Sequence, residues 1–152
     1  MPSRKLHKIP VIRADRRDTY EVASFAQEYV AKNGPTDPVF QLWFGNATDS
    51  YSKVLGVWES LLTSNKEGVL LRCDNPDGNC QFDGWRGHWR GDNGTSETVI
   101  CDASYTDRQF NTAFCAYGFE LATTKPQLYW SVDLIHRLFH VPQITNGLVD
   151  HL

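Results

Sequence analysis

Apolar side chains recur at the spacing of an α-helix in three segments of the chain. The helices that this pattern predicts cover residues from about 18 to 32, from about 49 to 64 and from about 126 to 141. Signals at their ends agree with the pattern. Asn33-Gly34-Pro35 stops the first helix, while Pro126 suits the first turn of the last helix and Pro142 its end. The chain therefore carries helices near both of its ends.

Two shorter apolar runs, over residues 69–72 and 98–101, predict β-strands. Between them, residues 74–95 are rich in Gly, Asp and Asn, which is typical of loops or a hairpin. Residues 1–16 are polar and are expected to form an extended segment. No repeat or low-complexity tract divides the rest, so we expect one α+β domain over residues 17–152, with N-terminal helices, a small sheet and a C-terminal helix.

The composition supports a folded domain and argues against two classes of partner. Of the 152 residues, 41% are hydrophobic, and the 5 Trp, 6 Tyr and 8 Phe can fill one core at this length. A net charge of -3 gives no reason to expect nucleic-acid binding. No apolar run approaches the ~18 residues that a membrane-spanning helix needs.

Four cysteines fit two disulfides. The local pairs Cys73–Cys80 and Cys101–Cys115 are favoured, because the turn residues between Cys73 and Cys80 could close a small loop. A four-cysteine zinc site is the alternative, but neither gap has the short C-x-x-C spacing that such sites use.

Two sequence patterns, Asn46-Ala47-Thr48 and Asn93-Gly94-Thr95, match the acceptor rule for N-glycosylation. Together with paired cysteines they indicate the secretory route, and hence a secreted, extracellular glycoprotein. The first ten residues lack the apolar core of a signal peptide, so we expect a trimmed mature form with an added methionine.

The strongest chemical signal is His136-Arg137-Leu138-Phe139-His140, close to the C-terminus. Two histidines four residues apart lie one above the other on a helix, which is how H-E-x-x-H peptidases hold zinc. Arginine replaces the glutamate that serves as general base in those enzymes, so the motif favours metal binding over hydrolysis. The same two histidines could also pack on an apolar helix without a metal, although unpaired imidazoles are costly in a buried setting.

A zinc ion held by two histidines needs at least one more protein ligand. His151 is the preferred candidate, because Gly147 lets the chain turn back after the helix ends. Asp150 is the alternative ligand, and would otherwise accept a hydrogen bond from a ligating imidazole. The predicted zinc site therefore comprises His136, His140 and His151, with Asp150 as the substitute for the third.

Arg137 fits two different roles. Its guanidinium stays protonated and cannot act as a base. An ion pair with Asp133, four residues earlier on the same helical face, has the favourable order of charges and would make Arg137 structural. Alternatively, Arg137 could bind a substrate carboxylate or an oxyanion, a catalytic role in which Glu120, Asp133 or a tyrosine would supply the base.

His88 lies in the aromatic and basic segment Gly87-His88-Trp89-Arg90-Gly91. We expect it to be a loop residue that packs against Trp85 or Trp89. The same aromatic loop would suit a module that binds carbohydrate or protein without a metal, which is one alternative function.

Four segments carry a resemblance to a known family: residues 87–91, 98–102, 129–142 and 149–151. They resemble the fungal secreted HRXXH peptidase family, which includes fungal antigens and a major mould allergen. A more distant resemblance is to the aspzincin, deuterolysin-like zinc metallopeptidases, through Trp43-Phe44-Gly45 and Cys101-Asp102.

The resemblance implies a zincin-like fold in which His136 and His140 bind Zn²⁺ and Arg137 stands at the position of the general base. It also implies a third ligand beyond the helix, which Asp150 matches, and an association with zinc capture. The function that follows is a secreted fungal zinc-binding protein on a metallopeptidase-like scaffold, active in zinc acquisition or in contact with a host or cell-wall protein or glycan. An active zinc metallopeptidase or hydrolase with an unusual base is the alternative.

Overall fold

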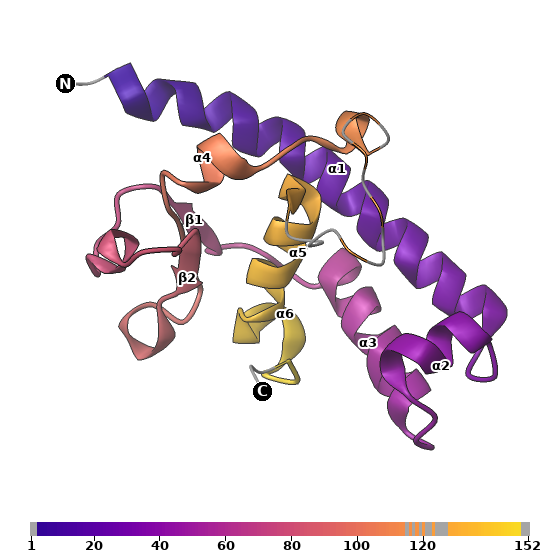
Figure 1. Cartoon of the computed structure of the whole chain (residues 1–152). Coiled ribbons are helices and arrows are strands. Elements are labelled where there is room, and N and C mark those ends of the chain that lie inside the picture. The colour runs from indigo at the N-terminus through magenta and orange to yellow at the C-terminus, as the bar shows by residue number, and fades with distance from the viewer. Residues whose placement is uncertain are drawn as a thin grey trace.

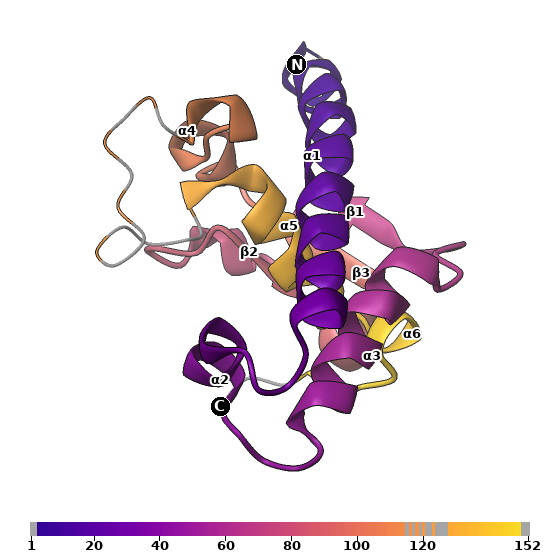
Figure 2. The ribbon, with the colours of Figure 1, turned by 90° about the vertical axis from the view of Figure 1, so that its right-hand side faces the viewer.

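The computed structural model describes residues 3–149 except 115, 117, 119, 121, 122 and 124–127, and describes side chains from residue 16 onward. Over this part of the chain, six α-helices and a three-stranded sheet make up the α+β domain that the sequence predicts. The helix α5 (Trp130–Phe139) lies between the long helix α1 (Ser3–Asn33) and the sheet (Figure 1). The side view shows α5 crossing α1 at an angle (Figure 2).

The N-terminal half of the chain is helical. After α1 come α2 (Pro38–Phe44) and α3 (Ser50–Thr63), and α3 confirms the second predicted helix. α2 begins where Asp37 accepts a hydrogen bond from the backbone N–H of Phe40, a side-chain N-cap. α1 packs on α3 through Ala23 and Leu61, which are both buried.

The first helix begins earlier than the sequence pattern predicts. Residues 3–16 are helical and continuous with the rest of α1, so the expectation of an extended segment is wrong for them. A polar segment shows no apolar period, yet it can extend an established helix, because each further residue adds a hydrogen bond and only the first turn is costly to form. Whether the domain itself begins at residue 17 stays a prediction.

The sheet is small and its central strand is the most buried. β3 (Glu97–Ile100) pairs in parallel with β1 (Leu70–Arg72) and antiparallel with β2 (Gly87–Trp89), so that β2 forms an edge. Val99 and Ile100 of β3 are buried completely or nearly so. β1 and β3 confirm the two predicted strands.

The C-terminal helices complete the core. α5 is followed by α6 (Pro142–Thr145), and the buried cluster joins Ile135, Val141 and Ile144 to Ala23 and Leu61 of the N-terminal helices. Burying an isoleucine side chain stabilises the fold by roughly 1.5–3 kcal/mol. The predicted start of the last helix, near residue 126, lies outside the described residues, but Tyr129 is extended, so α5 begins at Trp130, later than predicted. Four short helices occupy the connections: α4 (Ser104–Asp107), η1 (Asn79–Gln81), η2 (Gly91–Asn93) and η3 (Asn111–Ala113).

The disulfide joins Cys80 to Cys101, so the predicted local pairing is wrong. The two half-cystines are 21 residues apart in sequence, and their Cα atoms are 5.4 Å apart. Because β1 and β3 run in parallel, the segments that leave them emerge at the same edge of the sheet, which brings η1 next to the end of β3. Cys73 is a free thiol, 3.3 Å from the hydroxyl of Tyr105, and Cys115 lies outside the described residues.

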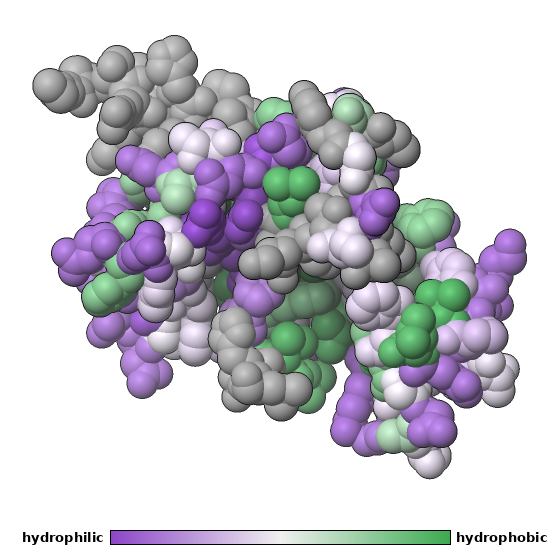
Figure 3. Space-filling model, in the orientation of Figure 1, coloured by the Kyte–Doolittle hydropathy of each residue, from purple (hydrophilic) through white to green (hydrophobic). Residues whose placement is uncertain are grey.

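The surface differs between the two ends of the molecule. Hydrophilic side chains gather over the sheet, whereas apolar ones surface over α2, where Leu42 and Trp43 are largely exposed (Figure 3). In the described part of the chain, no helix has both the length and the apolar content to cross a membrane.

Candidate metal centre

A cavity lies between the sheet and α5. Its volume is about 770 Å³, and its walls come from the segment 84–89, from Arg108, from α5 and from the segment 142–149. β2 forms one wall and the last turns of α5 form the wall opposite. This cavity brings together most of the residues that the sequence singles out for chemistry.

The two histidines of the motif face this cavity together. Their ring centroids are 4.8 Å apart, with the planes inclined at 75°. Two imidazoles that share one tetrahedral ion, with metal–nitrogen distances of about 2.0–2.1 Å, place their centroids roughly 5 Å apart. His136 is exposed to the cavity, and His140 is half-buried at the C-cap of α5, where its backbone is still in the helical region. Their separation is therefore compatible with a shared metal ion, although their role as ligands stays a prediction.

The side chain of Arg137 is buried, and all three nitrogens of its guanidinium donate hydrogen bonds. It is 5% exposed, and its Nε and Nη2 donate to the two carboxylate oxygens of Asp133 at 2.8 and 3.1 Å. Its Nη1 donates to the carbonyl oxygen of Val99 at 3.2 Å, which ties α5 to β3. The predicted ion pair with Asp133 is confirmed. Arg137 thereby joins the helix to the sheet, and whether it also has a catalytic role stays untested.

Gly87 makes room for this guanidinium. A Cβ atom at Gly87 would lie 2.0 Å from Arg137 Nη1 and 2.1 Å from the carbonyl oxygen of Val99, closer than any real contact. Gly87, the first residue of the aromatic and basic segment, must therefore be a glycine, because β2 passes close to Arg137 there.

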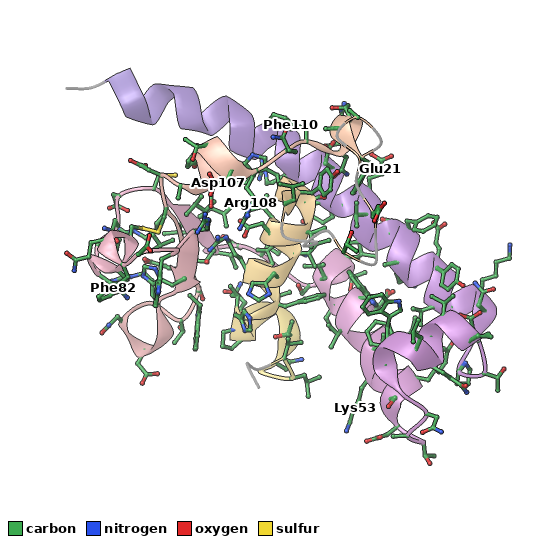
Figure 4. All side chains as sticks on the ribbon, in the orientation of Figure 1. Glu21, Lys53, Phe82, Asp107, Arg108 and Phe110 are labelled. Carbon is green, nitrogen blue, oxygen red and sulfur yellow. A yellow bond between two sulfur atoms is a disulfide. The ribbon has the colours of Figure 1, made fainter. Side chains whose placement is uncertain are left out.

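A second guanidinium, which no sequence pattern singles out, binds the same carboxylate. Arg108 Nη2 donates to Asp133 at 3.0 Å, and both side chains are about nine-tenths buried. The preceding residue, Asp107, pairs with Arg86. Asp107 and Arg108 lie next to each other where α4 ends (Figure 4). The end of α4 thus links the segment before β2 to α5. No local pattern marks Arg108, because its partner is 25 residues away.

The walls of the cavity carry excess positive charge. The described lining residues include three arginines but a single carboxylate, that of Asp133. Two of the guanidiniums, those of Arg108 and Arg137, bind this carboxylate, and Arg86 binds Asp107. A dication in the cavity would gain little from these walls and would need its own anionic or neutral ligands.

The two candidates for the third ligand, His151 and Asp150, lie outside the described residues. The chain leading to them is described as far as residue 149, and Gly147 and Val149 line the cavity that His136 and His140 share. The predicted return of the chain toward the histidines is in keeping with this path.

A second group of potential metal ligands lies on the other wall. The sulfur atoms of Cys80 and Cys101 and a ring nitrogen of His88 all lie within 4.8 Å of one another. His88 belongs to β2 and not to a loop, but its predicted packing against Trp85 is confirmed, with ring centroids 5.7 Å apart. Because the two sulfurs are bonded to each other, this cluster offers a metal one nitrogen ligand in its oxidised form.

Comparisons with known proteins agree with the motif. The sequence profile of the HRXXH family, described as "Putative peptidase family", matches residues 8–152. The chain belongs to the HRXXH family. The matched range includes the histidine pair, the arginine that follows the first histidine, and the strands β2 and β3. No solved structure matches the chain significantly.

Three curated relatives are fungal antigens or allergens by name. The chain is 41% identical to major allergen Asp f 2 of Aspergillus fumigatus, over 92% of the chain and 44% of that protein. It is 37% identical to Antigen 1 of Emericella nidulans, over 89% and 48%. It is 34% identical to the pH-regulated antigen PRA1 of Candida albicans, over 86% and 43%. The chain thus spans about half the length of the curated relatives it matches.

Proposed function

We propose that this HRXXH domain is a secreted zinc-binding module on a zincin-like scaffold. His136 and His140 hold the ion, with His151 or Asp150 as the third protein ligand. Arg137 acts as a structural residue in place of the general base of a peptidase. The observation that carries the proposal is the pair of imidazoles at 4.8 Å on one wall of the cavity.

The environment of Arg137 supports binding over hydrolysis. A zinc hydrolase needs a proton acceptor beside the metal-bound water. Arg137 cannot accept a proton, and both carboxylate oxygens of Asp133 already accept hydrogen bonds from guanidiniums. Neither member of the pair fits the role of a general base.

The charge of the cavity bears on the third ligand. An aspartate would compensate the dication better than a neutral imidazole, because Asp133 is already shared by Arg108 and Arg137. This argument favours Asp150, whereas the preference of zinc for imidazole favours His151. Comparing the zinc affinity of Asp150→Asn with that of His151→Ala separates the two: the true ligand is the one whose loss weakens binding more.

Elemental analysis of the purified chain at neutral pH tests the proposal. We expect one zinc per chain, lost on His136→Ala or His140→Ala and retained on His7→Ala, a control histidine in α1. Binding should also fail as the pH falls through the usual histidine range, near 6.5, because protonated imidazoles cannot ligate. A chain that takes up no zinc at neutral pH, or that keeps it without both helix histidines, contradicts the proposal.

Extracellular location and a role in zinc acquisition are parts of the same proposal. The disulfide, the two glycosylation patterns and the fungal antigens among the relatives support them. An active hydrolase remains the competing function, and the family description favours it. Peptide cleavage that a chelator abolishes, and that His136→Ala also abolishes, would decide in favour of the hydrolase.

A further inference from the structure

The cluster of Cys80, His88 and Cys101 is assembled from three separate elements. Cys80 lies in η1, His88 in β2, and Cys101 follows β3. Their potential ligand atoms lie within 4.8 Å of one another, and Cys101 is 2% exposed. The cluster is separate from the histidine pair of α5, although His88 also lines the cavity.

The imidazole of His88 is held in an orientation typical of metal ligands. Its side chain is 9% exposed, and its Nε2 lies 3.1 Å from a carboxylate oxygen of Asp77. Arg90 donates from Nε and Nη2 to the two carboxylate oxygens of Asp77, each at 2.8 Å, which fixes this carboxylate beside the imidazole. A neutral His88 therefore carries its proton on Nε2, where the carboxylate accepts it.

The other ring nitrogen, Nδ1, has no such partner while the disulfide is intact. His88 Nδ1 is buried and has no hydrogen-bond partner in the described structure. A buried acceptor without a partner is unfavourable unless something else binds it. A carboxylate behind one imidazole nitrogen and a free lone pair on the other form the outer half of a carboxylate–histidine–metal site.

We propose that reduction of the Cys80–Cys101 disulfide opens a second zinc site, in which the two thiolates and His88 Nδ1 are the protein ligands and Asp77 orients the imidazole. A dithiol reductant delivers two electrons and two protons to the S–S bond and becomes a disulfide itself. Zinc then displaces both thiol protons to solvent. The two thiolates balance the charge of the dication, so the site needs no further anion.

The dimensions fit this ion without a large rearrangement. With zinc–sulfur distances of about 2.3 Å and zinc–nitrogen distances of about 2.0–2.1 Å, tetrahedral ligand atoms are roughly 3.5–3.8 Å apart. The two sulfurs and a ring nitrogen of His88 already lie within 4.8 Å of one another, so the site needs only small rotations of these side chains. The fourth position would be left to water or to a ligand from the cavity.

Cobalt binding to a reduced variant tests the site. The variant carries His136→Ala and His140→Ala, to remove the α5 pair, and Cys73→Ser and Cys115→Ser, to remove other thiols. After reduction with a phosphine without oxygen, Co²⁺ should bind one per chain and show the intense near-ultraviolet charge-transfer band of cobalt thiolates. The oxidised variant should show no such band. Because the α5 histidines are absent, failure here leaves the zinc-binding function proposed above untouched.

Two further substitutions decide whether His88 is a ligand. Adding His88→Ala should weaken Co²⁺ binding at least tenfold, and Asp77→Asn, which keeps the shape of the carboxylate, should weaken it by about ten- to a hundredfold. His7→Ala is the matched control and should change nothing.

The fold of each variant is checked by circular dichroism in its oxidised form. If the reduced chain unfolds, its refolding on addition of Co²⁺ supports the site, and its failure to refold with metal overturns it. The proposal is also overturned if reduction produces no charge-transfer band, or if His88→Ala and Asp77→Asn both bind Co²⁺ as tightly as the parent.

Discussion

Two pairs of side chains on α5, Asp133 with Arg137 and His136 with His140, differ in burial and in bonding, although all four line the cavity. Asp133 and Arg137, the first pair, are 3% and 5% exposed and are joined to each other, to Arg108 and to the carbonyl oxygen of Val99. In the second pair, His136 is exposed and His140 half-buried. One helical turn therefore combines a closed polar network with a pair of histidines that are more accessible from the cavity.

The five-residue motif therefore has two properties that belong to different residues: accessible imidazoles and a buried contact with the sheet. The histidines supply groups that a metal can reach, whereas the arginine next to the first histidine supplies the contact that holds the helix against the sheet. A buried ion pair of this kind is strongly destabilising when one partner is removed, because the other charge stays buried. Substitutions in the two pairs should therefore affect different measurements.

Arg137→Glu should give the largest loss of stability. It would restore the residue pattern of a zinc peptidase, but it places a second carboxylate against Asp133 and removes the donor to the carbonyl oxygen of Val99. We expect a loss of about 3–5 kcal/mol in the free energy of unfolding, measured by urea denaturation. The control is Arg86→Ala, whose more exposed pair with Asp107 should contribute less than about 1 kcal/mol. Unchanged stability together with new chelator-sensitive hydrolysis would show that Arg137 occupies the place of a base.

Gly87→Ala disturbs the same network from β2, the strand that packs against Arg137. The new Cβ would lie 2.0 Å from Arg137 Nη1 and must displace it or the strand. Overpacking of this kind costs about 1–3 kcal/mol, which denaturation would detect. Gly56→Ala in α3, where nothing lies within 4 Å, is the control and should be neutral or stabilising by up to ~1 kcal/mol. Equal effects of the two substitutions would contradict the close approach of β2 to Arg137.

The sequence predicts the contacts within α5 better than the contacts between α5 and the rest of the fold. The spacing of His136 and His140 and the pairing of Asp133 with Arg137 follow from one helical turn, and both need only residues four apart. Arg108, the contact of Gly87 and the Cys80–Cys101 bond depend on how the sheet lies against α5, which no local pattern encodes. The cysteine pairing was predicted wrongly for the same reason, since it depends on the parallel pairing of β1 with β3.

Acid should remove the stabilisation that the ionised carboxylates of Asp77 and Glu97 give to the fold. Arg90 and His88 hold the pKa of Asp77 below its value in an unfolded chain, near 3.9, so Asp77 stabilises the fold above about pH 4 and that contribution is lost as the pH falls further. Glu97, whose pKa Arg72 and then Arg90 lower, acts in the same direction. Asp77→Asn should therefore flatten the decline of the melting temperature between about pH 5 and pH 2. A parallel decline in parent and variant would show that Asp77 contributes nothing.

His136→Ala should give the smallest effect on the metal-free fold, because its side chain is exposed in the cavity. Without metal, we expect its free energy of unfolding to lie within about 0.5 kcal/mol of the parent value. With zinc at a hundred times its dissociation constant, the parent should gain about 2.7 kcal/mol and the variant almost none. Thermal melts with and without zinc measure both differences, and His7→Ala should behave as the parent. A variant that loses stability without metal, by as much as Arg137→Glu does, would mean that the two pairs of side chains on α5 are not independent.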